Sequence, residues 1–326
     1  MEIDLREPVQ LGNTTQWIRI RAANARNPLL LLVQMGPGLP MINEVRTFGR
    51  LLSLEDDFTV IYWDQRGCGR SRRSGNSARD LSIKAMVSDT EQLLAMLCDR
   101  FGTPAVVAGF SIGATIAAQA AARRPDLVAA LVTAGMDIDG AAAEKHAYEF
   151  ALATAQARKN RRAIRQLAAI GPPPHLEARQ FATRARWAAN FGGVRTGHTY
   201  NSMLRSVLVS LLRSPDYSLA DTIRTIRGLT AAPAALLPEQ AALDLTHTLT
   251  SLNCPIVMVQ GRHDQVAPAS PAERYAGSLQ APSMQLVWFE HSAHMPHLEE
   301  PERFRELLAK VRLGLTSNSH INHAQA

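Results

Sequence analysis

The sequence predicts an α/β fold: a mostly parallel, doubly wound sheet with a helical cap inserted into it. Three observations predict this class. Short apolar runs of strand length alternate with helical periodicity, one long helical segment interrupts the alternation, and the strand pattern then resumes. A chain of 326 residues is long enough to bury one large core of this kind together with an insertion.

Seven segments carry strand patterns. The first, residues 17–20, alternates apolar residues with arginines, as expected of an antiparallel strand with one face in water. The other six are short apolar-rich runs typical of buried strands. They occupy residues 29–33, 58–63, 105–108, 127–133, 256–259 and 285–289. Helical stretches such as 82–101 lie between them, and this alternation predicts parallel pairing.

The long helical segment, residues 140–250, is rich in alanine and arginine and predicts a cap inserted into the core. The core then comprises residues 1–139 and 251–315, and the polar tail at 316–326 is expected to be disordered. The net charge of +6 resides in the cap region, since residues 139–248 hold 14 Lys+Arg against 8 Asp+Glu and the rest of the chain is balanced.

Composition narrows the classes of function and location. The simplest interpretation of the basic residues in the cap is that they form a solvated surface. No aromatic-rich basic motif accompanies them, so we expect no nucleic-acid partner. Cys68, Cys98 and Cys254 form no Cys-x-x-Cys pair, which argues against a zinc ribbon or a disulfide framework. The N-terminus lacks the order of a secretory signal, and the longest apolar run is far below the roughly 20 residues that cross a bilayer. We expect a cytoplasmic protein without a membrane partner.

The sharpest local signal is Gly-Phe-Ser-Ile-Gly at 109–113, between the predicted strand 105–108 and a helix of small residues at 114–123. This is the context that the nucleophile elbow of α/β hydrolases requires. The serine of such an elbow occupies a strained turn, and the flanking glycines avoid collisions with the neighbouring strand and helix. The pattern predicts Ser111 as a nucleophile, and the alternative is a serine that only caps the helix.

A glycine-rich loop, Gln-Met-Gly-Pro-Gly at 34–38, follows the first buried strand. Open α/β sheets bind their ligands at the carboxyl ends of their strands. In elbow enzymes, a backbone N–H of this loop and the N–H of the residue after the nucleophile hold the oxyanion. We therefore predict an oxyanion hole formed by Ile112 with Met35 or Gly36. The alternative is a simple tight turn.

A serine hydroxyl needs a base, and imidazole suits that role near neutral pH. His294 lies in the loop after the last core strand, and Asp264 follows the strand before it, so the chain order is serine, acid, histidine. We predict His294 as the base and Asp264 as the acid that orients it. Asp137 and Asp139 are rival acids.

Histidines at 291, 294 and 297 could instead bind a metal ion. Their loop contains a proline and lacks the i, i+4 spacing on a helix that zinc enzymes use. We therefore expect no metal and no other cofactor.

A longer string then indicates a family. Trp-Asp-Gln-Arg-Gly-Cys-Gly-Arg-Ser at 63–71 resembles the signature turn of the proline iminopeptidase-like α/β hydrolases, a family of cytoplasmic serine aminopeptidases. The resemblance covers most of the chain and implies the α/β-hydrolase fold. In that family, the positions of 35–38 form the oxyanion loop, 109–113 the elbow, Asp264 the acid and His294 the base.

Two departures separate this chain from that family. Gln-Met-Gly-Pro-Gly at 34–38 stands where the family has His-Gly-Gly-Pro-Gly, and methionine adopts a positive φ less readily than glycine. The resemblance also implies a Trp-Glu pair in the cap that binds the free amine of the substrate, whereas here Trp187 precedes Ala188. Glu144 and Glu149 are the candidates that remain for that role.

The sequence therefore predicts a serine hydrolase that cleaves an ester or amide bond of a small molecule or short peptide. An aminopeptidase of the proline iminopeptidase type is the first alternative. A protein that binds a metabolite or alters it without hydrolysis is the second, because a fold does not fix a function. The acyl group, the leaving group and the oligomeric state are left open.

Overall fold

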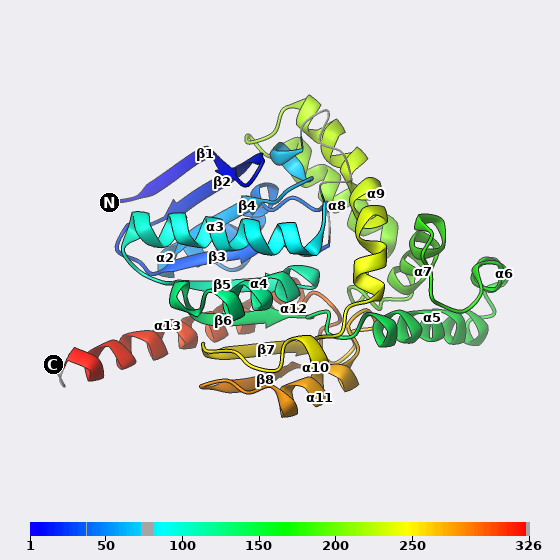
Figure 1. The fold of residues 1–326 in the computed structure, drawn as a ribbon. Helices are drawn as coiled ribbons and strands as arrows, with labels where there is room; N and C mark the ends of the chain where they lie inside the picture. The colour runs from blue at the N-terminus through cyan, green and yellow to red at the C-terminus, as the bar shows by residue number, and fades with distance from the viewer. Residues whose placement is uncertain (37, 73–80, 324–326) are drawn as a thin grey trace.

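One eight-stranded sheet forms the centre of the molecule (Figure 1). The computed structural model describes residues 1–36, 38–72 and 81–323. The strands are β1 (Ile3–Leu11), β2 (Thr14–Ala22), β3 (Leu29–Val33), β4 (Thr59–Asp64), β5 (Ala105–Phe110), β6 (Val128–Ala134), β7 (Ile256–Gly261) and β8 (Met284–Phe289). Their order in the sheet is β1-β2-β4-β3-β5-β6-β7-β8. β2 pairs antiparallel with both β1 and β4, and the six strands β4, β3, β5, β6, β7 and β8 are parallel. The predicted fold class is confirmed.

Helices cover both faces of this sheet. The helices of the core are α1 (Val45–Leu51), α2 (Leu54–Asp57), α3 (Ile83–Phe101), α4 (Ile112–Arg123), α11 (Ala269–Ser278), α12 (Pro296–Glu299) and α13 (Pro301–His323). Short 3-10 turns occupy η1 (Ile42–Glu44), η2 (Gly69–Ser71) and η4 (Pro125–Leu127). α3, α4 and α11 pack on one face, and α1 and α13 pack on the other (Figure 1).

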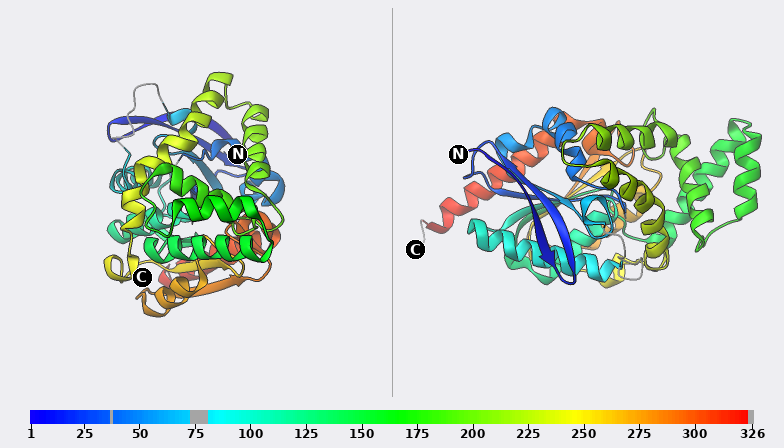
Figure 2. Two further views of the ribbon diagram at one scale, coloured as in Figure 1. Left: turned by 90° about the vertical axis from the view of Figure 1, so that its right-hand side faces the viewer. Right: turned by 90° about the horizontal axis from the view of Figure 1, so that it is seen from above.

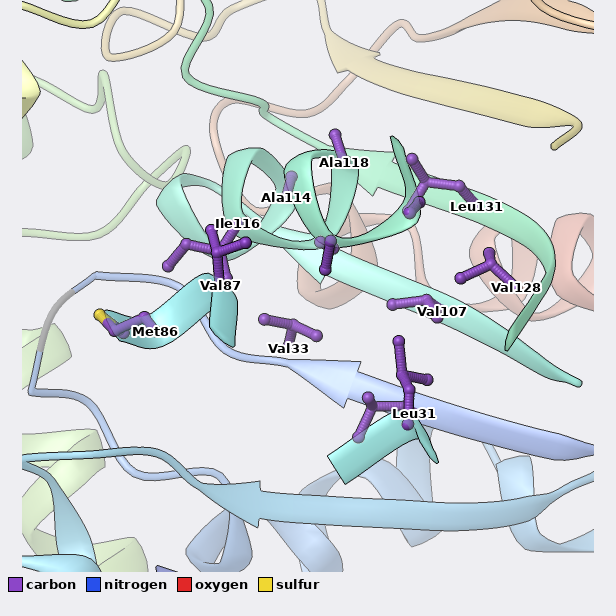
Figure 3. Packing of buried hydrophobic residues seen from close by; sticks show 14 of the residues in the cluster. Leu31, Val33, Met86, Val87, Val107, Ala114, Ile116, Ala118, Val128 and Leu131 are labelled. Carbon is purple, nitrogen blue, oxygen red and sulfur yellow. The ribbon is translucent and has the colours of Figure 1, made fainter. Parts of the chain in front are cut away.

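The central strand β3 explains why the sequence reads as continuously apolar at 29–33. Successive side chains of a strand point to opposite faces, so Leu31 and Val33 pack toward α3 and α4 (Figure 3). Leu30 and Leu32 point the other way, into the cluster that contains α1 and α13. Because helices cover both faces, every position of the strand must be apolar.

The two chain ends differ from the sequence analysis. β1 was not predicted, although Ile3, Leu5, Val9 and Leu11 alternate with polar residues in the pattern of a strand with one wet face. At the other end, where residues 316–326 were expected to be disordered, α13 continues as far as His323 through a stretch that contains no proline; residues 324–326 lie outside the described residues. No helix in the described part of the chain is both long and apolar enough to span a bilayer.

The segment between β6 and β7 contains the cap helices. These are α5 (Gly140–Ala157), α6 (Arg161–Ile170), α7 (Ala178–Asn190), α8 (Tyr200–Arg213), α9 (Leu219–Ala241) and α10 (Leu245–Thr248). α5, α6 and α7 extend beyond the sheet and bury a small cluster of their own that includes Tyr148, Leu167 and Trp187 (Figure 2). The cap therefore combines a separate apolar centre with contacts to the core.

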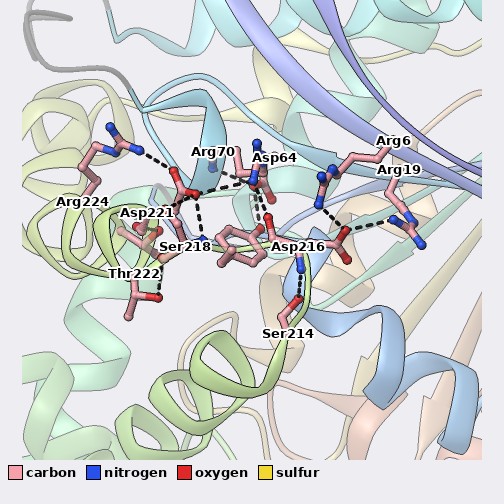
Figure 4. A network of polar contacts seen from close by, with 12 residues as sticks. Arg6, Arg19, Asp64, Arg70, Ser214, Asp216, Ser218, Asp221, Thr222 and Arg224 are labelled. Atoms are coloured by element: carbon pink, nitrogen blue, oxygen red, sulfur yellow. Dashed lines mark hydrogen bonds and ion pairs between the residues drawn. The ribbon is translucent and has the colours of Figure 1, made fainter.

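A polar network fixes the turn between α8 and α9 to the core (Figure 4). The carboxylate of Asp216 accepts hydrogen bonds from Arg6 and Arg19, each at 2.9 Å. The next residue, Tyr217, donates its hydroxyl hydrogen bond to Asp64 at 2.6 Å, and Asp64 lies fully buried at the end of β4. This part of the cap is therefore held by both the first two strands and the centre of the sheet.

Candidate active site

The predicted nucleophile lies on the sharp turn between β5 and α4. Ser111 has φ 53° and ψ −129°, and its N–H donates to the carbonyl of Ala134 at 2.8 Å. A residue with a side chain rarely adopts such a positive φ, so the surrounding contacts must hold the strained turn. The Ser111 hydroxyl makes no hydrogen bond that caps α4. The alternative role of Ser111, as a serine that only caps helix α4, therefore does not account for the position of this hydroxyl.

The flanking glycines permit two close approaches of the backbone. A Cβ at Gly109 would lie 2.5 Å from the Cα of Ala114 in α4. A Cβ at Gly113 would lie 2.4 Å from the carbonyl oxygen of Val33 and 2.3 Å from that of Gln34. Real Cβ contacts of this length do not occur, so only glycine lets α4 start this close to the end of β3.

Gly113→Ala should lower the free energy of unfolding by about 3 kcal/mol, because the added methyl group meets backbone carbonyls that cannot rotate away. The matched control is Gly277→Ala in α11, where a Cβ would meet no atom within 4 Å. Urea titration of both variants measures the difference. Equal unfolding midpoints would contradict the packing argument.

Three loops at the carboxyl ends of β5, β7 and β8 bring three buried side chains together. The Nε2 of His294 lies 2.9 Å from the Oγ of Ser111. The Nδ1 of the same ring lies 2.8 Å from the Oδ2 of Asp264. The structure thus brings the three predicted residues into one hydrogen-bonded chain, although they come from distant parts of the sequence.

Local contacts fix the orientation of the acid. The Oδ1 of Asp264 accepts hydrogen bonds from the backbone N–H groups of Val266 at 2.8 Å and Ala267 at 2.9 Å, which leaves Oδ2 for the histidine. The loops that carry the acid and the base touch directly, since a Cβ at Gly261 would lie 1.8 Å from the carbonyl oxygen of Ala293. A glycine at the end of β7 is therefore needed for this contact.

Burial and charge act in opposite directions on His294. Burial is the largest single effect and lowers the pKa of the imidazole, whereas the charge of Asp264 and its hydrogen bond raise it. The charges of Asp137 and Glu299 also raise it, and these effects together exceed that of burial, so the pKa of His294 lies above its ordinary value of 6.5. The carboxylate thus stabilises the imidazolium that forms when the ring takes a proton.

The pH dependence of hydrolysis should follow from this shift. A base accepts a proton only in its neutral form, so kcat/KM should fall as the pH drops through the raised pKa of His294. We expect the midpoint of the acid limb above pH 6.5. Initial rates between pH 5 and 9 measure it, and a midpoint well below 6.5 would contradict the assigned pair.

The two rival acids do not orient the histidine. Asp139 accepts a hydrogen bond from the N–H of Ala142 at 2.9 Å and caps α5. Asp137 is near enough to raise the pKa of His294, but it is not hydrogen-bonded to that ring. Among the described residues, Asp264 is the carboxylate in hydrogen-bond contact with the base.

The other two histidines of the His-x-x-His-x-x-His pattern lie in different surroundings. His291 is exposed. His297 is buried, with its ring centroid 4.2 Å from that of Phe110 and 5.7 Å from that of Phe48. Burial, with the nearby charge of His294, lowers the pKa of His297 to about 3. Within the described parts of the chain, no cluster of three His, Cys, Asp or Glu side chains could hold a metal ion.

The backbone of the predicted oxyanion loop shows whether Met35 or Gly36 can supply the second N–H donor. Positive φ values in this loop fall on Gly36, at 58°, and Gly38, at 93°, and Met35 is not among the positive-φ residues. The N–H of Met35 donates to the side-chain oxygen of Gln34 at 2.8 Å. Gly36 and Ile112 instead line the cavity that contains Ser111. The geometry favours Gly36 over Met35 as the second donor, and Pro37 lies outside the described residues.

A cavity of about 170 Å³ opens at the nucleophile. Core and cap residues line it together, and the sequence analysis did not identify most of those from the cap. The polar cap residues in its wall are Glu144, His175, Arg184 and Gln240. They come from α5, α7, α9 and a loop, so no local motif marks them as one group.

The two candidate amine-binding glutamates, Glu144 and Glu149, lie in different places. Glu144 lines this cavity, where its carboxylate accepts the N–H of His175 at 3.0 Å and lies 3.9 Å from Arg184. Glu149 is exposed, 4.0 Å from Lys145, and does not line the cavity. Of the two, only Glu144 is in a position to face a bound substrate.

Comparison with known proteins agrees with this architecture. The chain is 29% identical over 309 residues to a protein of Bacillus subtilis named "Probable aminopeptidase YbaC", and the match covers 94% of this chain and 96% of that protein. A proline iminopeptidase-related protein from Thermus thermophilus superposes with a TM-score of 0.64 at 19% identity, over 96% of this chain and 98% of the other. An esterase from Thermogutta terrifontis gives 0.56 at 19% identity, over 95% and 99%.

The likeness to these solved structures concerns the fold, and the family follows from a direct match. Residues 28–301 match the family described as the alpha/beta hydrolase fold, and the matched region spans β3 to the start of α13. The predicted resemblance to proline iminopeptidase-like α/β hydrolases is confirmed at the level of the family. The chain belongs to the α/β-hydrolase fold family, and its relatives support a role as a hydrolase.

Proposed function

We propose that this protein is a serine hydrolase that cleaves an ester or amide bond through an acyl-enzyme. Ser111 attacks the carbonyl carbon while His294 takes the hydroxyl proton, and Asp264 stabilises the imidazolium. His294 then gives this proton to the leaving alcohol or amine as the bond to it breaks. Water attacks the acyl-enzyme with His294 as base, and the acid product leaves Ser111 free.

The oxyanion of each tetrahedral intermediate needs donors on the side of the attacked carbonyl. The N–H groups of Ile112 and Gly36 are our candidates, because both residues line the cavity with Ser111. Ile112 is the first residue of α4, so the positive end of the helix dipole adds to its N–H.

One observation carries this proposal. The Oγ of Ser111, the imidazole of His294 and the carboxylate of Asp264 are joined by contacts of 2.9 Å and 2.8 Å beside an open cavity. A helix cap or a buried structural histidine would not need this chain to end at a cavity.

Labelling with a fluorophosphonate probe tests the proposal. The native protein should be labelled, whereas Ser111→Ala should not, because the probe reacts with an activated serine. Ser71→Ala is a control, since the hydroxyl of Ser71 is buried and hydrogen-bonded to the backbone of Asp64. Equal labelling of the native protein and Ser111→Ala would reject the nucleophile.

A second candidate is an aminopeptidase that releases an N-terminal residue. The similarity to the Bacillus subtilis protein named as a probable aminopeptidase favours it, because that match runs over nearly the whole of both chains. Aminoacyl 4-nitroanilides with a free amine test it, with their N-acetylated counterparts as controls. Cleavage of only the N-acetylated compounds would exclude this candidate.

A further inference from the structure

We propose that Asp137 binds a protonated amine of the substrate, close to the carbonyl that Ser111 attacks. The inference rests on the proposed hydrolysis at Ser111 and specifies the class of acyl group that it accepts. It assigns this role to an aspartate of the core, not to a glutamate of the cap.

The position of Asp137 is the first argument. It follows β6 at the carboxyl end of the sheet and lines the same cavity as Ser111 and Ile112. Within residues 1–36, 38–72 and 81–323, no hydrogen bond or ion pair reaches its carboxylate. The carboxylates of Asp139 and Asp264 both accept backbone N–H groups, so Asp137 differs from the other aspartates of this region.

Asp137 is half-buried, and a carboxylate that is partly removed from water without a partner is costly. A charge removed from water needs a partner, and without one the neutral form gains. Burial raises the pKa of Asp137 to about 6, and the charges of His294 and Arg184 only partly oppose this effect. At pH 7 and above most of this carboxylate is ionised, so the cavity wall carries a negative charge that a bound cation would neutralise.

Apart from Asp137, the charged side chains of the cavity wall lie close to a side chain of opposite charge. Glu144 lies 3.9 Å from Arg184, and the Nδ1 of His175 lies 3.2 Å from the same carboxylate. With Glu144 and Arg184 facing each other, Asp137 is the remaining charge of the wall. The cavity therefore favours a cation over an anion.

A second acceptor lies in the same wall. The side-chain oxygen of Gln240, on α9, is buried and has no hydrogen-bond partner among the described residues. An unpaired buried acceptor is rare, and together with the half-buried carboxylate of Asp137 it fits a ligand that supplies several N–H donors. A primary ammonium carries three donors and one positive charge, which suits Asp137 and Gln240 together.

Two isosteric esters test this inference. The 4-nitrophenyl ester of L-alanine carries an ammonium where 4-nitrophenyl 2-methylpropanoate carries a methyl group. The native protein should prefer the alanine ester, and Asp137→Asn should lower kcat/KM for it by about 10- to 100-fold, the range of a hydrogen bond to a charged group. The 2-methylpropanoate ester should change less than about threefold. Gln240→Leu should reduce the same preference by a smaller factor.

The matched control is Asp139→Asn, the same change two residues away. Asparagine also caps helices, so α5 and both activities should be retained. Thermal unfolding of each variant, followed by circular dichroism, checks that the fold is intact.

The pH dependence gives an independent readout. Both esters use His294, so its titration cancels in the ratio of their kcat/KM values. The ratio should fall as the pH drops through about 6, because protonated Asp137 cannot neutralise an ammonium. His294, Asp264 and Arg184 are the charged groups whose fields act on Asp137, and they act equally with both esters. In Asp137→Asn the ratio should not vary between about pH 5 and 7, where the α-amine of the alanine ester, with an ordinary pKa of about 7.7 to 8.0, stays protonated.

Other outcomes would overturn the inference. An equal loss for both esters in Asp137→Asn would mean that Asp137 acts through His294 and not on the substrate. A native preference for the neutral ester, or for an ester with an acidic group, would exclude a cation site. If neither ester reacts faster with the native protein than with Ser111→Ala, the proposed hydrolysis itself fails, and this inference fails with it.

Discussion

Ser111→Ala should lower kcat for a 4-nitrophenyl ester by about a millionfold, the loss seen when a serine nucleophile is removed from a catalytic triad. Removing one oxygen leaves the imidazole of His294 and the carboxylate of Asp264 in contact, but no atom remains to form the acyl-enzyme. The rate that survives should come only from binding and from the oxyanion donors. Steady-state kinetics with freshly purified variant and the native protein as reference measure the loss.

The fold should tolerate this change. Alanine at position 111 keeps the backbone and removes a hydroxyl that does not cap α4, so the melting temperature should change little. A variant that melts normally yet retains more than about one hundredth of the native kcat would rule out Ser111 as the nucleophile.

Asp264→Asn should lower kcat by about 10,000-fold. The two backbone N–H groups at Val266 and Ala267 hold the amide oxygen of the new side chain, which turns its NH₂ group toward the ring of His294. The ring must then accept at Nδ1 and carry its proton on Nε2, the atom that faces Ser111. A ring in this tautomer cannot take the serine proton.

The variant should also change the pH profile. Without the charge of Asp264, burial lowers the pKa of His294, so the acid limb of the residual activity should move to lower pH. Asp139→Asn is the matched control and should keep the native rate and profile. If Asp264→Asn lost little activity while Asp137→Asn lost as much as a triad variant, the acid would be Asp137.

Local sequence carried much of the information on the elbow. Strand β5, the turn at Ser111 and helix α4 are contiguous, and Gly109 and Gly113 mark the turn because no other residue fits beside Ala114 and Val33. The oxyanion loop was less certain from the sequence. Whether the N–H of Met35 is available depends on the rotamer of Gln34, which no pattern of residue types reveals.

The cap was predicted as a helical segment but not as a cavity wall. Its composition identifies residues 140–250 as helical, but it does not reveal that Gln240 and Arg184 line the cavity beside Ser111. Their placement depends on how the cap packs over the core, including the anchoring of Asp216 by Arg6 and Arg19.

The sequence by itself determined the alternation of strands and helices, the elbow serine, and the order in which serine, acid and histidine follow each other. It offered three aspartates and three histidines for two roles. Chain order already favoured His294 and Asp264, but only the tertiary structure brings their side chains into contact with Ser111, since the base lies 183 positions from Ser111 and 30 from Asp264. Contacts over such separations are created by the order and twist of the strands that carry the loops, which residue types along the chain do not specify.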